Sequence, residues 1–120
     1  MFGLFGGSAP KLSVDDIQHG VEDGSMVLVD CRDPMELRST GKAKGALSVP
    51  LATMAMKCNP SSPECLPEFK NGDKTIVLYC ASGARAAGAA NMLRQMGHTE
   101  VQNLGGLNNW AMGGGDVVAP

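Results

Sequence analysis

Short apolar runs without polar alternation constrain the fold of this 120-residue chain more than any other feature. The clearest are residues 26–30 (MVLVD) and 75–79 (TIVLY), which are rich in β-branched side chains. A strand that lacks a polar residue at every second position is typical of a parallel sheet with both faces covered. Residues 46–50 and 101–104 predict two shorter strands, and Pro50 ends the first of them.

Helix signals alternate with these runs. Ser13 followed by Asp16, and Asp33 followed by Glu36, are capping patterns that predict helix starts. The predicted helices, in chain order, span residues 14–21, 34–41, 51–56 (one or two turns), 84–96 and about two turns after Gly106. Helices that alternate with buried strands are typical of an open α/β sheet.

The length of the chain fits one domain with a modest core and leaves little room for a second. We expect one domain over residues 1–120, with its core at about 11–112. Residues 57–73 contain three prolines and an Asn-Gly-Asp turn, so most of this segment is expected to be loop. The sequence leaves open whether residues 1–10 and 113–120 pack on the domain or extend from it.

Charge and hydropathy argue against several classes of function. A net charge of -2 offers no basic surface for nucleic acid or for an anionic membrane. No apolar stretch approaches the roughly 18 residues that a membrane span needs. Residues 1–7 lack the basic start and long apolar centre of a secretory signal. We therefore expect a cytoplasmic protein that binds neither nucleic acid nor membrane.

The four cysteines fit reactive or buried thiols in a reducing compartment better than a disulfide framework. None forms a C-x-x-C pair, and only His19 and His98 could add nitrogen ligands, so we expect no metal site and no cofactor. Cys58 and Cys65 lie in the proline-rich loop. They could form a redox pair or supply a resolving thiol, but a loop disulfide or two unreactive thiols is the favoured interpretation.

Residues 79–85 (YCASGAR) carry the strongest functional signal because they join the clearest strand to the clearest helix. Ligands of open α/β sheets gather at the carboxyl ends of strands, and a helix start adds unpaired N–H groups with a partial positive charge. This position should lower the pKa of the Cys80 thiol. Gly83 lets the loop turn its N–H groups inward, and Arg85 adds a permanent cation. A small buried residue ending a strand is the alternative interpretation of Cys80, but the combination favours a catalytic site.

Four ordered motifs resemble those of the rhodaneses, which are sulfurtransferases that form a cysteine persulfide. Residues 80–85 resemble the active-site loop of that family, and residues 29–32 (VDCR) with Glu36 resemble its D-V-R signature with a downstream glutamate. Residues 45–50 (GALSVP) resemble the G-A-x-x-I-P segment, and residues 105–110 (GGLNNW) resemble the closing G-G-x-x-x-W. The resemblance covers nearly the whole chain. It implies a single rhodanese-like α/β domain, with a central, mostly parallel, five-stranded sheet flanked by helices on both faces.

The sequence departs from the family pattern at two places. Residues 41–43 (GKA) stand where many members have Gly-His-Ile, and Cys31 replaces the aliphatic residue of D-V-R. We interpret Cys31 as a small packed residue, with a reactive thiol as the less favoured alternative. Asp30, Arg32 and Glu36 are interpreted as a structural charge cluster rather than a substrate site.

The resemblance implies a double displacement. The Cys80 thiolate would attack the outer sulfur of a donor such as thiosulfate and displace sulfite, and the persulfide would then pass its sulfur to cyanide, a cellular thiol or a protein thiol. Arg85 would help to hold an anionic donor, and the backbone N–H groups of the loop would stabilise the persulfide. The residues expected to bind the substrate are Ala81, Ser82, Gly83 and Ala84.

Two alternatives from other classes stay open. The domain could be a persulfide carrier or a docking module with poor turnover of small donors, since Ala81 and Ala84 leave the rim of the loop without selective polar groups. It could also be a phosphatase or arsenate reductase of the related cell-cycle phosphatase type. Those enzymes have five residues between cysteine and arginine and a histidine before the cysteine, whereas this chain has four residues and Tyr79.

Overall fold

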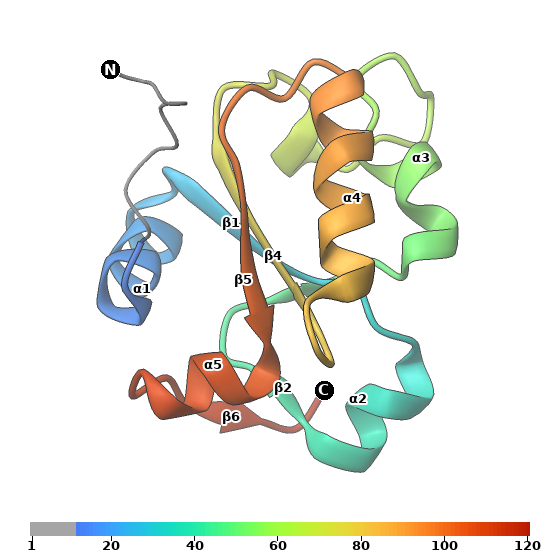
Figure 1. Ribbon diagram of the computed structural model, residues 1–120. Coiled ribbons are helices and arrows are strands. Elements are labelled where there is room, and N and C mark those ends of the chain that lie inside the picture. Colours follow the sequence, from blue (N-terminus) through green and yellow to red (C-terminus); the bar gives the residue numbers. More distant parts are fainter. Residues whose placement is uncertain (1–11) are drawn as a thin grey trace.

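The computed structural model describes residues 12–120. Within this range the main sheet has four strands in the order β3-β1-β4-β5, and every neighbouring pair is parallel. The strand bounds are β1 (Met26–Asp30), β3 (Leu47–Ser48), β4 (Thr75–Cys80) and β5 (Val101–Gly106). Figure 1 shows helices on both sides of this sheet, which confirms the predicted α/β architecture.

The expected count of five strands in the main sheet is wrong. β2 (Lys42–Ala43) and β6 (Val117–Val118) pair with each other, antiparallel, as a separate two-stranded sheet. The segment after α2 is extended over only two residues, and these bond to the C-terminal segment instead of the main sheet. The hydrogen bond of 2.9 Å from the Lys44 N–H to the Asp116 carbonyl extends this pairing. As a result, the main sheet ends at β3 on this side.

Local capping explains where the helices begin and end. The helices are α1 (Val14–Asp23), α2 (Pro34–Thr40), α3 (Met54–Lys57), α4 (Ala84–Gln95) and α5 (Leu107–Met112), with 3-10 turns at Leu51–Thr53 and Pro67–Phe69. The Asp16 N–H donates to Ser13 Oγ at 3.0 Å, and the Ser13 N–H donates to the Asp16 carboxylate at 3.1 Å. α1 continues past the expected end because its C-cap is Gly24, whose φ of 83° lies in the left-handed region.

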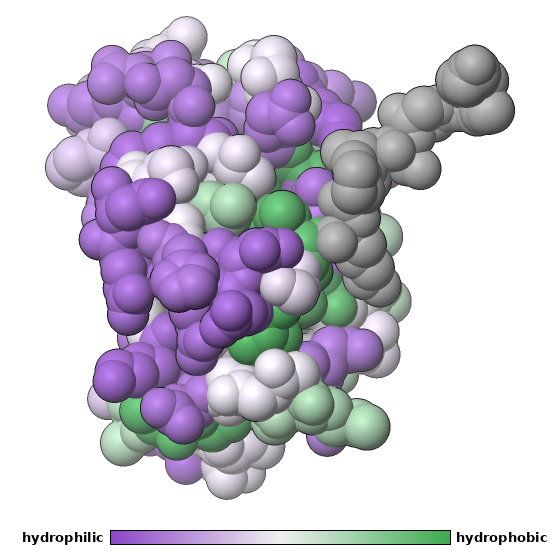
Figure 2. Space-filling model, turned by 90° about the vertical axis from the view of Figure 1, so that its left-hand side faces the viewer, coloured by the Kyte–Doolittle hydropathy of each residue, from purple (hydrophilic) through white to green (hydrophobic). Residues whose placement is uncertain are grey.

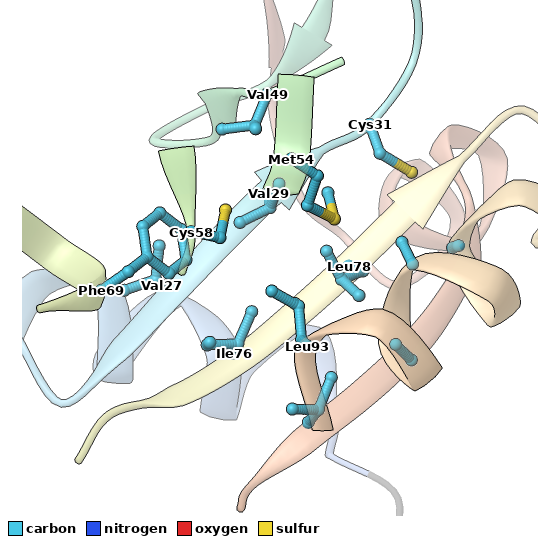
Figure 3. Packing of buried hydrophobic residues seen from close by; sticks show 14 of the residues in the cluster. Val27, Val29, Cys31, Val49, Met54, Cys58, Phe69, Ile76, Leu78 and Leu93 are labelled. Atoms are coloured by element: carbon cyan, nitrogen blue, oxygen red, sulfur yellow. The ribbon is translucent and has the colours of Figure 1, made fainter. Parts of the chain in front are cut away.

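Each face of the main sheet packs against its own set of helices. Successive side chains of a strand point to opposite faces, so β1 and β4 contribute to two separate apolar clusters. Val27 and Leu78 lie in the cluster under α3 and α4, while Leu28 and Val77 lie in the one under α1 and α5. Figure 3 shows the first of these clusters. Burial on both faces explains why these strands lack polar alternation.

The C-terminal segment is part of the fold. Besides the β2–β6 pairing, the indole N–H of Trp110 donates to the Asp116 carbonyl at 2.7 Å. The other tail, and the expectation for residues 1–7, lie outside the described residues. In the part of the chain that is described, no helix is both long and apolar enough to cross a bilayer. The face shown in Figure 2 is mostly hydrophilic, with smaller apolar areas.

Candidate functional site

The loop between β4 and α4 places the Cys80 side chain at the start of a helix. Cys80 ends β4, and α4 begins four residues later at Ala84. Gly83 has a φ of 101°, and a Cβ added there would lie 3.2 Å from the Cα of Gly105, so both its backbone angle and its neighbour require glycine. The Cys80 residue is fully buried, with 0% of its surface exposed, although Ala81 is exposed.

Backbone N–H groups of this loop converge on the Cys80 sulfur. The Gly83 N–H donates to Cys80 Sγ at 3.0 Å. Burial by itself raises the pKa of Cys80, but hydrogen bonds from the N–H groups of Ala86, Gly83, Ser82 and Arg85 outweigh it, so the pKa is lowered. These hydrogen bonds therefore favour the thiolate relative to an ordinary cysteine. Sequence reasoning missed Ala86, which stands one residue beyond the motif.

The other predicted loop residues lie around this sulfur in different ways. Ser82 is exposed, and its Oγ accepts a long hydrogen bond of 3.5 Å from the Ala84 N–H. Ala84 is also exposed. The Ala81 carbonyl lies so close to Gly106 that no side chain fits at position 106. The loop is therefore packed closely against the end of β5. The loop thus presents its three small side chains outward and its N–H groups toward the sulfur.

The Arg85 guanidinium is held by a carboxylate from α2. Its two terminal nitrogens donate to Glu36 Oε1 at 2.7 Å and to Glu36 Oε2 at 2.9 Å. The paired hydrogen bonds lower the pKa of Glu36 to about 2 and raise that of Arg85. About a third of each side chain is exposed. Glu36 also acts electrostatically on Arg32, so the expected charge cluster of Asp30, Arg32 and Glu36 extends to Arg85.

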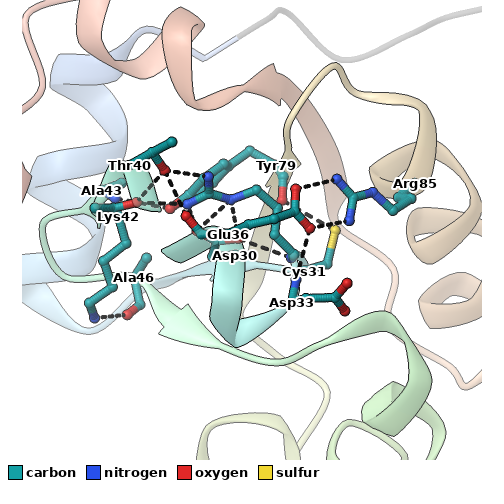
Figure 4. A network of polar contacts seen from close by, with 12 residues as sticks. Asp30, Cys31, Asp33, Glu36, Thr40, Lys42, Ala43, Ala46, Tyr79 and Arg85 are labelled. Atoms are coloured by element: carbon teal, nitrogen blue, oxygen red, sulfur yellow. Dashed lines mark hydrogen bonds and ion pairs between the residues drawn. The ribbon is translucent and has the colours of Figure 1, made fainter. Parts of the chain in front are cut away.

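Asp30 and Arg32 form a buried ion pair in the same polar network (Figure 4). Arg32 Nη2 lies 2.7 Å from Asp30 Oδ2, and the guanidinium also donates to Thr40 Oγ1 and to the Gly41 carbonyl, each at 2.8 Å. The guanidinium carbon stands 5.8 Å from the centroid of the Tyr79 ring. These contacts tie the end of α2 to β1 and so fix the helix that carries Glu36. A structural role for this pair was the expectation.

An amide from β5 supports the loop from the other side. Asn103 Nδ2 donates to the Gly83 carbonyl at 3.0 Å, and Asn103 Oδ1 accepts from the Gly105 N–H at 2.8 Å. The register of β4 and β5 shifts between Leu78 and Tyr79, next to this contact. Sequence reasoning missed Asn103, and the available signal was a polar residue inside the short run before the double glycine.

The remaining cysteines are buried and reduced. Cys31 is 1% exposed, and its thiol donates to the Tyr79 carbonyl at 3.2 Å. Cys58 and Cys65 are free thiols, which excludes the loop disulfide and leaves the other half of the favoured interpretation, two buried thiols. Burial raises the pKa of Cys31 and of Cys58 to about 12. Within residues 12–120, no three His, Cys, Asp or Glu side chains are grouped closely enough to hold a metal ion.

Comparison with protein families assigns this fold and its motifs to one family. The model of the rhodanese-like domain matches residues 13–112. The chain belongs to the rhodanese-like domain family. This rhodanese-like domain is 35% identical over 96 residues to a protein of Allochromatium vinosum named sulfurtransferase, with 79% of this chain and 80% of that protein covered. It is 31% identical over 84 residues to the thiosulfate sulfurtransferase PspE of Escherichia coli, covering 70% of this chain and 73% of the relative.

Solved structures agree with this assignment of the fold. A protein from Rhodopseudomonas palustris, described as of unknown function and a possible tyrosine phosphatase, is 27% identical and superposes with a TM-score of 0.71. The match covers 93% of this rhodanese-like domain and 98% of the other chain. The domain spans only 64% and 28% of the length of two longer relatives, so the same fold also occurs within larger proteins.

Proposed function

We propose that this rhodanese-like domain transfers sulfane sulfur from an anionic donor such as thiosulfate to a thiophilic acceptor through a persulfide on Cys80. The observation that carries the proposal is the convergence of loop N–H groups on a buried sulfur whose pKa is lowered. The names of two relatives, a sulfurtransferase and a thiosulfate sulfurtransferase, support the same chemistry.

The first displacement forms one sulfur–sulfur bond and breaks another. The Cys80 thiolate attacks the outer sulfur of thiosulfate, and sulfite leaves with the bonding pair, so the negative charge of the thiolate is carried by the new persulfide. The N–H groups that stabilise the thiolate also suit this anion, because their dipoles already point at the site where charge accumulates. In the second displacement an acceptor such as cyanide or a thiol takes the outer sulfur and regenerates the thiolate.

Arg85 is suited to hold the anionic part of the donor. Its guanidinium is partly exposed and charged at all physiological pH values, but Glu36 already occupies its two terminal nitrogens. A donor anion therefore has to share Arg85 with Glu36 or displace that carboxylate. This competition would disfavour weakly charged donors, because only an anion can replace the electrostatic attraction that Arg85 loses when it parts from Glu36.

The test is the intact mass of the protein after thiosulfate treatment, measured beside Cys80→Ser. We expect wild type to gain one sulfur atom, which cyanide removes, and the variant to gain none. A wild-type protein that stays unmodified, with Cys80 shown to be reduced, would contradict the proposal for thiosulfate. Saturation by small donors at useful concentrations then separates an enzyme from a persulfide carrier or docking module.

The phosphatase alternative is supported by the description of the Rhodopseudomonas palustris structure as a possible tyrosine phosphatase. The loop argues against it, because four residues between Cys80 and Arg85 make a smaller ring than the five of the cell-cycle phosphatase type. Hydrolysis of an aryl phosphate by wild type, absent in Cys80→Ser, would favour this alternative. We expect no hydrolysis above the level of the variant.

A further inference from the structure

A second cysteine lies beside Cys80 on the neighbouring strand. β1 and β4 are parallel neighbours in which Asp30 is paired with Tyr79, so the next positions in this register are Cys31 and Cys80. The Cys31 N–H donates to the Tyr79 carbonyl at 3.1 Å, which keeps the start of Cys31 against β4 where β1 ends. Adjacent strands lie about 4.8 Å apart in a sheet. Cys31 and Cys80 thus each follow directly on the last paired position of β1 and β4.

Both side chains point to the same face of the sheet. Cys31 and Cys80 belong to the apolar cluster under α3 and α4, together with Val29 and Leu78, which precede them by two residues on their strands. Figure 3 shows the Cys31 side chain directed toward the end of β4. A disulfide needs Cα atoms roughly 4.4–6.8 Å apart and side chains that face one another. Cys31 and Cys80 follow the paired positions Asp30 and Tyr79 and lie on the same face, so we infer that their sulfurs can be brought together by side-chain rotation and a small local shift.

The two thiols differ in their protonation. Burial raises the pKa of Cys31 to about 12, and the negative charges of Cys80 and Asp30 add to this effect, while the charge of Arg85 opposes it. The Cys31 thiol also donates its proton to the Tyr79 carbonyl. The surroundings thus favour the thiolate at Cys80 and the protonated thiol at Cys31. In the proposed reaction Cys80 meets the donor, and Cys31 is a buried thiol of the same apolar cluster.

We propose that Cys31 is a resolving thiol that attacks Sγ of the Cys80 persulfide, expels sulfide and closes a Cys31–Cys80 disulfide. The inference rests on the proposed function, because the persulfide is its substrate. The sulfur–sulfur bond of the persulfide breaks and a new one forms between the two cysteines. The outer sulfur is reduced to sulfide, the two cysteine sulfurs supply its two electrons, and the Cys31 proton leaves with it as HS⁻. A dithiol reductant returns both cysteines to thiols.

Such a step gives the domain a second outcome besides transfer. When an acceptor is present, it takes the sulfur and Cys80 is regenerated. When no acceptor arrives, the sulfur leaves as sulfide and Cys80 is protected in a disulfide. Because Cys31 must lose its proton, resolution should be slow near neutral pH and accelerate about tenfold per pH unit below the pKa of Cys31.

The experiment loads wild-type protein with thiosulfate, removes the donor and holds the persulfide without an acceptor. We expect one equivalent of sulfide and a protein two hydrogens lighter than the reduced form. Trypsin under non-reducing conditions should then release peptide 12–32, which holds Cys31, joined to peptide 75–85, which holds Cys80. Cys58 and Cys65 share one tryptic peptide, 58–70, so a bond between them cannot give this product.

Cys31→Ser keeps a donor for the Tyr79 carbonyl and should hold the persulfide at least tenfold longer than wild type, without sulfide release. Cys31→Val, an aliphatic residue as in the family signature, serves if the serine variant does not fold. Cys65→Ser, in the same buried cluster, is the matched control and should behave as wild type. A persulfide that forms but decays equally in wild type and Cys31→Ser overturns the inference alone. If no sulfur is added to wild type, the proposed function fails and the resolving role fails with it.

Discussion

At the scale of single residues, the surroundings of the cysteines decide which of them can react. All four are buried, but only the sulfur of Cys80 receives several N–H donors. The pKa of Cys80 is lowered, whereas burial raises the pKa of Cys31, Cys58 and Cys65. Since the thiolate is the nucleophile, reaction with an external reagent should begin at Cys80 while the protein is folded.

Alkylation of the folded protein should therefore modify Cys80 first. We expect the rate of reaction with iodoacetamide to reach half of its maximum at a lower pH than for an unperturbed cysteine thiol. Peptide mapping should find the label in residues 75–85, and Cys80→Ser should abolish the fast phase. Equal labelling of Cys58 or Cys65 at neutral pH would contradict this assignment.

At the scale of the secondary-structure elements, α2 and β5 hold the loop between β4 and α4 from two sides. Glu36 brings a carboxylate from α2 to Arg85, and Asn103 brings an amide from β5 to the Gly83 carbonyl. The loop contains only small residues between Cys80 and Arg85, so these outside contacts replace the packing that larger side chains would supply. The geometry of the N–H ring depends on both.

The ion pair between α2 and α4 should make stability depend on acid pH. The pKa of Glu36 falls to about 2 from an ordinary value of 4.5, so its stabilisation is complete above about pH 5 and is lost as the pH falls toward 2. Glu36→Gln should lower the melting temperature at pH 7, and the difference from wild type should shrink as the pH falls toward 2. Because the pair is partly exposed, we expect a small effect. A difference that persists unchanged at pH 2 would mean that the carboxylate charge is not its source.

Loss of the β5 amide should weaken the N–H ring. Asn103→Ala removes two hydrogen bonds, worth about 1 kcal/mol each, and frees the Gly83 carbonyl to turn. We expect the pKa of Cys80, measured by the pH dependence of alkylation, to rise toward that of an ordinary thiol. Asn108→Ala, at an exposed position of α5, is the control and should leave this pKa unchanged. A melting temperature that falls in Asn103→Ala without a change in the alkylation profile would reduce Asn103 to a purely structural role.

At the scale of the whole molecule, the C-terminal segment closes the side of the domain that carries α5. Trp110 is fully buried, and its indole N–H depends on the Asp116 carbonyl. The β2–β6 pairing joins the same segment to the residues that follow α2. Contacts of this segment thus reach the helix that carries Glu36.

Removal of residues 116–120 should destabilise the domain. The truncation leaves the Trp110 N–H without its acceptor and removes the partner of β2, and an unpaired buried donor alone costs about 1–3 kcal/mol. Urea unfolding should show a lower midpoint at an unchanged slope. Ala119→Gly, at an exposed position of the same segment, is the control and should unfold as wild type. An unchanged midpoint after truncation would show that water replaces these contacts at no cost.

Much of the fold could be predicted from the sequence because its signals are local. The runs around Val29 and Val77, the capping pair at Ser13, and the turn at Gly83 each depend on neighbours in the chain. The same holds for Cys80 at a strand end. Contacts between distant positions could not be predicted from these patterns. Arg85 binds Glu36, which lies 49 positions away in the sequence, and no local sequence pattern predicts that ion pair.

Two further features escaped prediction for the same reason. The C-terminal strand pairs with β2 across more than 70 residues, and neither of these two short strands was among the predicted ones. Asn103 donates to the carbonyl of Gly83, which lies 20 positions away in the sequence. A single polar residue does not reveal in the sequence which group it will bind. In each case the sequence does not show which distant part of the chain the residue will contact.

The close approach of Gly83 and Gly106 to neighbouring backbone has a practical consequence for engineering donor preference. A side chain at Gly106 would collide with the Ala81 carbonyl, and one at Gly83 would be strained by its positive φ and a tight contact with Gly105, so neither is suited to variation in a library. Ala81, Ser82 and Ala84 are exposed and point away from the N–H ring. Mutagenesis confined to these three positions would change the shape and charge that a donor meets while leaving the reacting sulfur and its hydrogen bonds in place.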